Sequence, residues 1–135
     1  MSENSKEMAG ASSFGLRLRF QSPKGMGREE LATLVVRMLR SMGEAVDQTG
    51  RALIGHIKVF LTVPGGSLKA NLVDLDLGPE TENDLPGELI ESGEIRYMAA
   101  VIGLTDEEVE QLMEGSLGSL QHKLKIDVLE HKHEH

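Results

Sequence analysis

The spacing of apolar residues changes along this chain, and the change separates strands from helices. Every second residue from Phe14 to Phe20 is apolar, which is the period of a half-buried strand. From Leu31 to Val46, apolar residues recur at every third or fourth position, which predicts a helix from about Arg28 to Gln48. A chain that contains both periods is expected to pack helices against a sheet.

Further strands follow this helix. Leu53 to Thr62 and Ser67 to Asp76 are apolar-rich and flank Pro64-Gly65-Gly66, which predicts a β-hairpin. From Ile95 to Ile102, apolar residues occur at both odd and even positions, so both faces of this strand are apolar, as expected for a central strand. Apolar and polar residues alternate again over residues 124–128, which indicates a short last strand.

A second helix begins with a capping box. Thr105 is the expected N-cap and Glu108 the acid that reciprocates, while Leu104 and Val109 are placed to form a hydrophobic staple. Gly115 is expected near its end.

The segment between the hairpin and the central strand is rich in acids. Residues 77–93 contain two breaker pairs, Gly78-Pro79 and Pro86-Gly87, and are predicted to be a long mobile loop. The spacing of acids from Asp74 to Asp84 resembles a calcium loop only superficially, because Gly78 and Pro79 do not fit an EF-hand.

These elements predict an α+β fold, a two-layer sandwich in which two helices cover one face of a four- to five-stranded mixed sheet. The expected order is β-α-β-β-β-α with an optional terminal β, and a right-handed crossover would make the first two strands parallel neighbours. The expected organisation is a disordered segment over residues 1–13 and a single domain over 14–128. Residues 129–135 are interpreted as an expression tag or a His-rich metal-binding tail.

Charge is divided by position. Up to Leu72, ten Lys and Arg stand against six acids, whereas from Val73 onward four bases face sixteen acids, for a net charge of −8. Such a chain can offer a basic patch to an anion while its acidic part repels nucleic acid. The chain has no Cys, which excludes disulfides and thiolate metal sites, and it has no long apolar run. A cytoplasmic protein without membrane association is therefore expected.

Strand parity divides the sheet residues into two faces. The side chains expected to point inward are Leu16, Leu18, Ile57, Val59, Leu61, Leu68, Ala70 and Leu72. The uncovered face would then carry Phe60 and a set of polar and basic residues, which form the predicted ligand-binding site: Arg17, Arg19, His56, Lys58, Lys69, Asn71 and Arg96. A solvated sheet face with no ligand is the structural alternative.

Two other features have structural explanations. The segment Lys24 to Arg28 contains two glycines before a helix, but its spacing matches no phosphate-binding motif, so turn formation is favoured. His56 could serve as an acid or base, although a cross-strand histidine with no evident orienting carboxylate is more often structural.

The sequence favours a non-enzymatic binding or accessory module that uses its basic sheet face for an acidic protein partner or a small anion. The alternative is a small enzyme that acts on a phosphorylated or carboxylated metabolite with His56 as acid or base. No cofactor or metal site is predicted. RNA binding is disfavoured because Phe60 alone cannot supply the stacked aromatics of sheet-based readers. A homodimer is expected from the exposed sheet edge and the opposite charges of the two halves.

Overall fold

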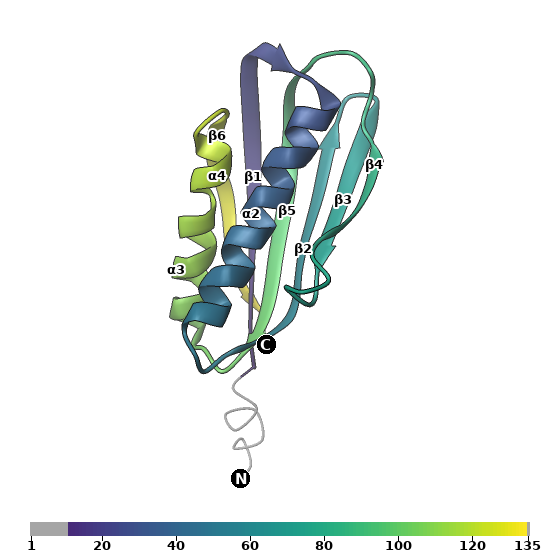
Figure 1. Ribbon diagram of the computed structural model, residues 1–135. Coiled ribbons are helices and arrows are strands. Elements are labelled where there is room, and N and C mark those ends of the chain that lie inside the picture. Colours follow the sequence, from purple (N-terminus) through teal and green to yellow (C-terminus); the bar gives the residue numbers. More distant parts are fainter. Residues whose placement is uncertain (1–10, 135) are drawn as a thin grey trace.

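The computed structural model describes residues 11–134, which form a six-stranded sheet with helices on one face (Figure 1). The strands are β1 (Ala11–Met26), β2 (Leu53–Val63), β3 (Gly66–Leu72), β4 (Glu80–Asp84), β5 (Ile90–Ile102) and β6 (Lys125–Glu134). The helices are α2 (Arg28–Gln48), α3 (Asp106–Ser116) and the single turn α4 (Gly118–Gln121). Across the sheet the order is β4-β3-β2-β5-β1-β6, and every neighbouring pair is antiparallel.

The topology consists of two interlocked strand–helix–strand units. β5 lies between the two strands of the unit β1-α2-β2, and β1 lies between the two strands of the unit β5-α3-β6. This arrangement is the split βαβ, or ferredoxin-like, plan. Here β3 and β4 extend it at the β2 edge. β5 and β1 are therefore the strands through which both units are held together.

The predicted four- to five-stranded mixed sheet is wrong, because the sheet has six strands and all of its pairings are antiparallel. The first two strands are not neighbours, since β5 inserts between them and pairs with both. The predicted loop over residues 77–93 is also wrong, because it contains β4 and the beginning of β5. β4 has the sequence Glu-Thr-Glu-Asn-Asp and lacks apolar alternation. Charged residues are typical of an edge strand, whose pairing depends on its partner rather than on a buried face.

α2 has the predicted bounds and supplies one side of the core. Its apolar stripe, from Leu31 to Val46, is buried, and Leu39 is completely so. Gly43 lies where the helix comes closest to β3, since a Cβ atom there would approach Leu72 Cδ2 to 2.7 Å. The glycine thus permits the close approach that closes the core at this end of α2.

The capping box of α3 is confirmed. The backbone N–H of Glu108 donates to Thr105 Oγ1 over 3.1 Å, and the N–H of Thr105 donates to Glu108 Oε1 over 2.9 Å. Leu104 and Val109, on either side of the cap, are both buried. Backbone and guanidinium hydrogen bonds from Thr105 and Arg51 lower the pKa of Glu108. The local sequence therefore fixes where α3 begins.

The last strand extends further than the alternation over residues 124–128 indicates. β6 continues to Glu134, so most of the segment interpreted as a tag or tail pairs with β1. Leu129 interrupts the register, because Arg17 lies opposite Glu130 whereas Leu18 lies opposite Val128.

Within the described residues, no helix combines the length and the apolar character that crossing a membrane requires. The predicted disordered segment, residues 1–13, is wrong at its end, because Ala11, Ser12 and Ser13 belong to β1 and pair with β5; residues 1–10 fall outside the described residues.

Candidate functional site

The two faces of the sheet differ as strand parity predicts. The residues expected to point inward are all buried, with exposures of 3% or less: Leu16, Leu18, Ile57, Val59, Leu61, Leu68, Ala70 and Leu72. Figure 1 shows the helices on one side of the sheet only. The opposite face, called here the uncovered face, is therefore where the polar side chains of the same strands are displayed.

A row of four residues crosses the middle of the uncovered face. Arg17 of β1 is opposite Arg96 of β5, Arg96 is opposite Phe60 of β2, and Phe60 is opposite Lys69 of β3. The ammonium group of Lys69 lies 5.8 Å from the centre of the Phe60 ring, within the range of a cation–π contact. Three cations thus stand in one row, and two of them are direct cross-strand neighbours.

β2 has a β-bulge just before His56. The pairing of β2 with β5 skips Gly55, so that Ile54 lies opposite Val101 but His56 lies opposite Ala100. A Cβ atom at Gly55 would lie 2.8 Å from the carbonyl oxygen of Ala100, so the bulge requires a glycine. The extra residue lets Ile54 pack against the core, while His56, the neighbour of buried Ile57, faces the uncovered side by ordinary alternation.

Acids from the other half of the chain share the same face. Glu80 and Glu82 of β4 lie opposite Asn71 and Lys69 of β3, and Glu94 of β5 lies opposite Arg19 of β1. Their positions follow from strand pairings that sequence alone did not predict. The uncovered face is consequently mixed in charge, and the cations must be considered by their immediate surroundings.

One hollow of about 560 Å³ covers the β3 and β2 side of this face. It brings together three of the predicted site residues, Lys58, Lys69 and Asn71, with the carboxylates of Glu80 and Glu82. Asn71 Oδ1 is buried and has no hydrogen-bond partner among the described residues. Because two carboxylates face two ammonium groups, this hollow has little net charge.

A second hollow, of about 450 Å³, covers the β5 and β1 side. It collects three other predicted residues, Arg17, His56 and Arg96, together with Lys132 and Glu130 of β6. Small residues at Ser13 and Gly15 also line it. Three permanent cations line this hollow with one carboxylate, and a second carboxylate, Glu94, reaches Arg17 from beside it, which leaves a surplus of one positive charge. We call it the arginine hollow; Arg19, the remaining predicted residue, lines neither hollow.

The two arginines of the arginine hollow have different partners. The Arg17 guanidinium lies 3.5 Å from a carboxylate oxygen of Glu94 and 3.5 Å from one of Glu130. The Arg96 guanidinium has no ion-pair partner in the part of the chain that the structure describes. Arg96 is thus the cation of this hollow whose charge remains available to a ligand.

His56 is mainly neutral at pH 7 in this setting. Partial burial, and then the positive charge of Lys58, lower the pKa of His56 from its ordinary value of 6.5. Its imidazole has no hydrogen-bond or ion-pair partner among the described residues. It can therefore accept a proton when a negative group enters the hollow.

The other candidates from the sequence have structural explanations. The turn favoured for residues 24–28 is not formed: Lys24 to Met26 are the irregular end of β1, where Gly25 has a φ of +80°, and Arg28 begins α2. Arg28 Nη2 donates to the carbonyl oxygen of Asn83 over 3.0 Å, which holds this segment to the β4 region. In residues 11–134, a group with metal-ligand geometry occurs at Glu110, Glu114 and His131, on the helix side of the sheet. It is separate from the uncovered face and is considered below.

Comparison with known proteins gives no family. No family model and no curated protein sequence matches the chain. A crystal structure of a hydantoinase/carbamoylase family amidase from Burkholderia ambifaria is similar, with a TM-score of 0.44 and 11% identity over 92% of this chain and 29% of that one. A crystal structure of Zn(II)-bound YjiA GTPase from E. coli is similar with a TM-score of 0.39 and 17% identity, covering 85% of this chain and 32% of that one. This chain thus spans about a third of either protein, and similarity at this level supports no functional assignment.

Proposed function

We propose that this protein is a binding module that holds an anionic oxygen group, a carboxylate or a phosphate, in the arginine hollow. The observation that carries the proposal is the unpaired Arg96 guanidinium opposite Arg17. Like charges directly opposite each other destabilise a sheet. An anion between them would offset that repulsion and would gain charge-assisted hydrogen bonds from planar donor groups.

The surroundings of Arg96 suit a ligand of small size. Ser13 and Gly15 leave room beside the arginines, and a Cβ atom at Gly15 would meet only the side chain of Met98 at 3.5 Å and more distant backbone oxygens. His56 of β2 lines the same hollow. The anion would therefore be held by two guanidinium groups and one imidazole from three adjacent strands.

Binding would couple to the charge of His56. An anion near the imidazole raises the pKa of His56, opposing the effects of burial and of Lys58. Protonated His56 would then donate a further hydrogen bond to the anion. Among the described residues no carboxylate is placed to orient the imidazole, so its position favours binding over acid–base catalysis in the alternative enzyme.

The experiment that tests the proposal is an NMR titration with inorganic phosphate, with acetate and with a short glutamate-rich peptide at constant ionic strength. We expect saturable shift changes at Arg96, Arg17 and His56 with at least one of these ligands. Phosphate or acetate alone would identify a free anion. Binding only of the peptide would identify the acidic side chains of a protein partner as the source of the carboxylate.

Two variants give the test its specificity. Arg96→Gln should weaken binding by about tenfold or more, which is about the 1.5–3 kcal/mol of one hydrogen bond to a charged group. Arg37→Gln removes an equally charged, exposed residue from α2, in the other layer, and should bind as the parent does. Shifts that do not saturate, or that are equally weakened by both variants, would show general charge screening and refute the proposed function.

A further inference from the structure

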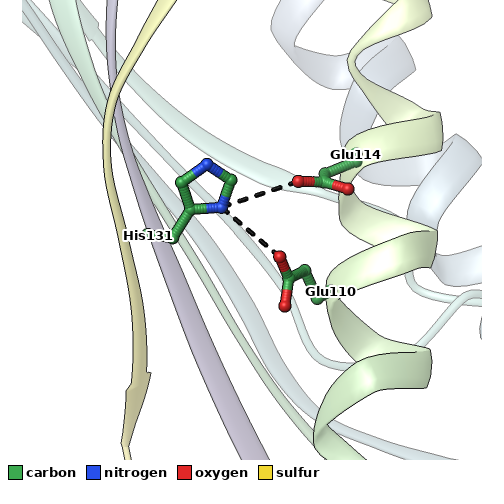
Figure 2. A group of neighbouring side chains, drawn as sticks. All are labelled: Glu110, Glu114 and His131. Carbon is green, nitrogen blue, oxygen red and sulfur yellow. Dashed lines mark ion pairs between the residues drawn. The ribbon is translucent and has the colours of Figure 1, made fainter.

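A second cluster of chemistry-bearing side chains lies on the opposite side of the sheet, between α3 and β6. Figure 2 shows the His131 imidazole of β6 facing two glutamates on α3. Its Nδ1 atom lies 3.4 Å from a carboxylate oxygen of Glu110 and 3.5 Å from one of Glu114. One donor atom from each of the three side chains lies within 4.8 Å of the others.

The sequence positions explain why these groups meet. Glu110 and Glu114 are four residues apart on α3, so they lie on the same side of the helix on successive turns. His131 lies opposite Leu16 in the pairing of β6 with β1, and Leu16 points toward the helix layer. The imidazole therefore points toward α3. The ring of Phe14, which is buried, lies 6.0 Å from the His131 ring and limits the orientations available to it.

We propose that Glu110, Glu114 and His131 form a site for a divalent transition-metal ion of the zinc type. Zinc bonds of about 2.0–2.2 Å to nitrogen and carboxylate oxygen place neighbouring ligands of a tetrahedral site about 3.3–3.5 Å apart. The two nitrogen–oxygen separations, 3.4 and 3.5 Å, already fall in this range. A mixed set of one imidazole and two carboxylates suits zinc better than magnesium or calcium, which prefer oxygen alone.

Charge and access agree with this assignment. Metal binding requires a deprotonated imidazole, and the two carboxylate charges that then remain are neutralised by a dication. No basic residue stands in the last turn of α3, and Glu114 lies near the negative end of the helix dipole. The side chain of His131 is 45% exposed, that of Glu110 28% and that of Glu114 43%. An ion can therefore enter the site, and water can occupy a fourth coordination position. The bound ion would fasten the edge strand β6 to α3.

The site requires residues from both the helix and the segment interpreted as a tag or His-rich tail. This requirement separates it from nonspecific chelation by the tail, which contains His131, His133 and His135. Two of the three proposed donors belong to α3, and their variants leave every tail histidine in place. The alternative without a metal is a simple ion pair between a protonated His131 and the two glutamates, and measured metal binding that depends on Glu110 and Glu114 distinguishes the metal site from it.

The test is a titration of the full chain with Zn²⁺ by calorimetry and with Co²⁺ by visible absorption. We expect one ion per chain and the intense absorption of tetrahedral Co²⁺. Loss of a group that only supports a ligand commonly weakens metal binding by about 10–100-fold. Glu110→Gln and Glu114→Gln each remove a direct ligand, so each should weaken binding by at least about tenfold. Glu107→Gln, an exposed acid on the same helix, is the matched control and should bind as the parent does.

The histidine variants complete the test. His131→Ala should abolish the tetrahedral Co²⁺ spectrum, whereas the double variant His133→Ala/His135→Ala should retain it. Equal Zn²⁺ affinity in the parent and in Glu110→Gln/Glu114→Gln would show chelation by the tail alone and overturn the proposal, as would absence of binding in the parent. Neither result bears on the arginine hollow, which lies on the other face of the sheet.

Discussion

Arg17 of β1 and Arg96 of β5 lie directly opposite each other near the middle of the uncovered face, and only Arg17 has carboxylate partners. The carboxylates of Glu94 and Glu130 offset part of the repulsion between the two guanidinium groups, and an anion beside Arg96 would offset more. We expect Arg96→Gln to stabilise the free protein by about 0.2–1 kcal/mol, the range for cross-strand pairs. The free energy of unfolding, measured with urea at low ionic strength, is the quantity to compare.

Salt gives this prediction its control. At 1 M salt the Debye length falls to about 3 Å, so the repulsion between exposed guanidinium groups is screened and the gain from Arg96→Gln should disappear. Arg37→Gln, on the other layer, should give no gain at either ionic strength. A loss of stability in Arg96→Gln at low salt would mean that Arg96 makes favourable contacts that outweigh its repulsion from Arg17.

A second prediction concerns the titration of His56. The pKa of His56 is lowered first by burial and then by the charge of Lys58, so Lys58→Met should raise it while leaving the effect of burial in place. Lys69→Met, which removes an equal charge from the next strand, should change it less. NMR titration of the His56 imidazole measures the pKa in each variant, and equal shifts in both would exclude a specific effect of Lys58.

The sign of the linked stability change follows from the same shift. Because the pKa of His56 in the folded protein is lower than its unfolded value of 6.5, the unfolded chain binds the proton more readily. His56 thus contributes stability above pH 6.5, and this contribution is lost as the pH falls through the lowered pKa. His56→Gln should reduce the loss of stability on acidification in that window, as measured by urea unfolding at a series of pH values.

Sequence patterns predicted the parts of this fold that depend on local physics. The bounds of α2, the capping box of Thr105 and the inward parity of β1, β2 and β3 are all set by neighbouring residues and were correctly inferred. Pairing between distant strands has no such local signal. β5 has the apolar character of a central strand, but nothing in its own residues states that it separates β1 from β2.

The same limit applies to the two sites. Strand parity was enough to place Arg17, Arg96 and His56 on one face, but it could not show that Arg96 lies beside Arg17 without a carboxylate of its own. Glu110 and Glu114 were not singled out, although their spacing of four on an amphipathic helix is a recognisable signal. Their link to His131 arises only from the antiparallel pairing of β6 with β1.

A third prediction concerns the buried contact that joins β5 to α3. The Ser116 hydroxyl donates to the carbonyl oxygen of Met113 over 2.6 Å, so it accepts the hydrogen bond from the Tyr97 hydroxyl, 2.7 Å away. Ser116→Ala leaves the fully buried Tyr97 hydroxyl unpaired and should cost about 1–3 kcal/mol. Tyr97→Phe should cost less, about 0.5–1.5 kcal/mol, because Ser116 keeps its other partner. Urea unfolding measures the free energy of unfolding of both variants. A larger loss in Tyr97→Phe than in Ser116→Ala would contradict this assignment of donor and acceptor.

A fourth prediction concerns β4, where the sequence predicted a mobile loop. Its backbone pairs with β3 from Ser67 opposite Asp84 to Asn71 opposite Glu80. An edge strand bonds through alternate amides, so hydrogen exchange should be slow at alternating positions of residues 80–84 and fast at the positions between them. Residues 87–89, which lie outside any strand, provide the fast reference. Uniformly fast exchange across β4 would restore the loop interpretation.

The last prediction is self-association through the uncovered face; the sequence predicted a dimer formed either by a basic face against an acidic loop or by edge strands. The sheet has its centre between β2 and β5, where the side chains of Phe60 and Met98 are 38% and 43% exposed. A two-fold dimer in which the uncovered faces of two copies stack would bring these apolar side chains of the two copies together.

In such a dimer a carboxylate from the partner's acidic β4 edge, such as Glu82, would serve as the anion proposed above for the arginine hollow. Charge pairing would weaken as salt rises, whereas apolar contact between Phe60 and Met98 would persist or strengthen. Sedimentation at low and high salt separates the two contributions. Glu82→Lys should shift the protein toward monomer at low salt, and Glu107→Lys, on the helix layer, should not. A strict monomer at high protein concentration in both buffers would refute the dimer and leave the arginine hollow open to a free anion or to another acidic protein.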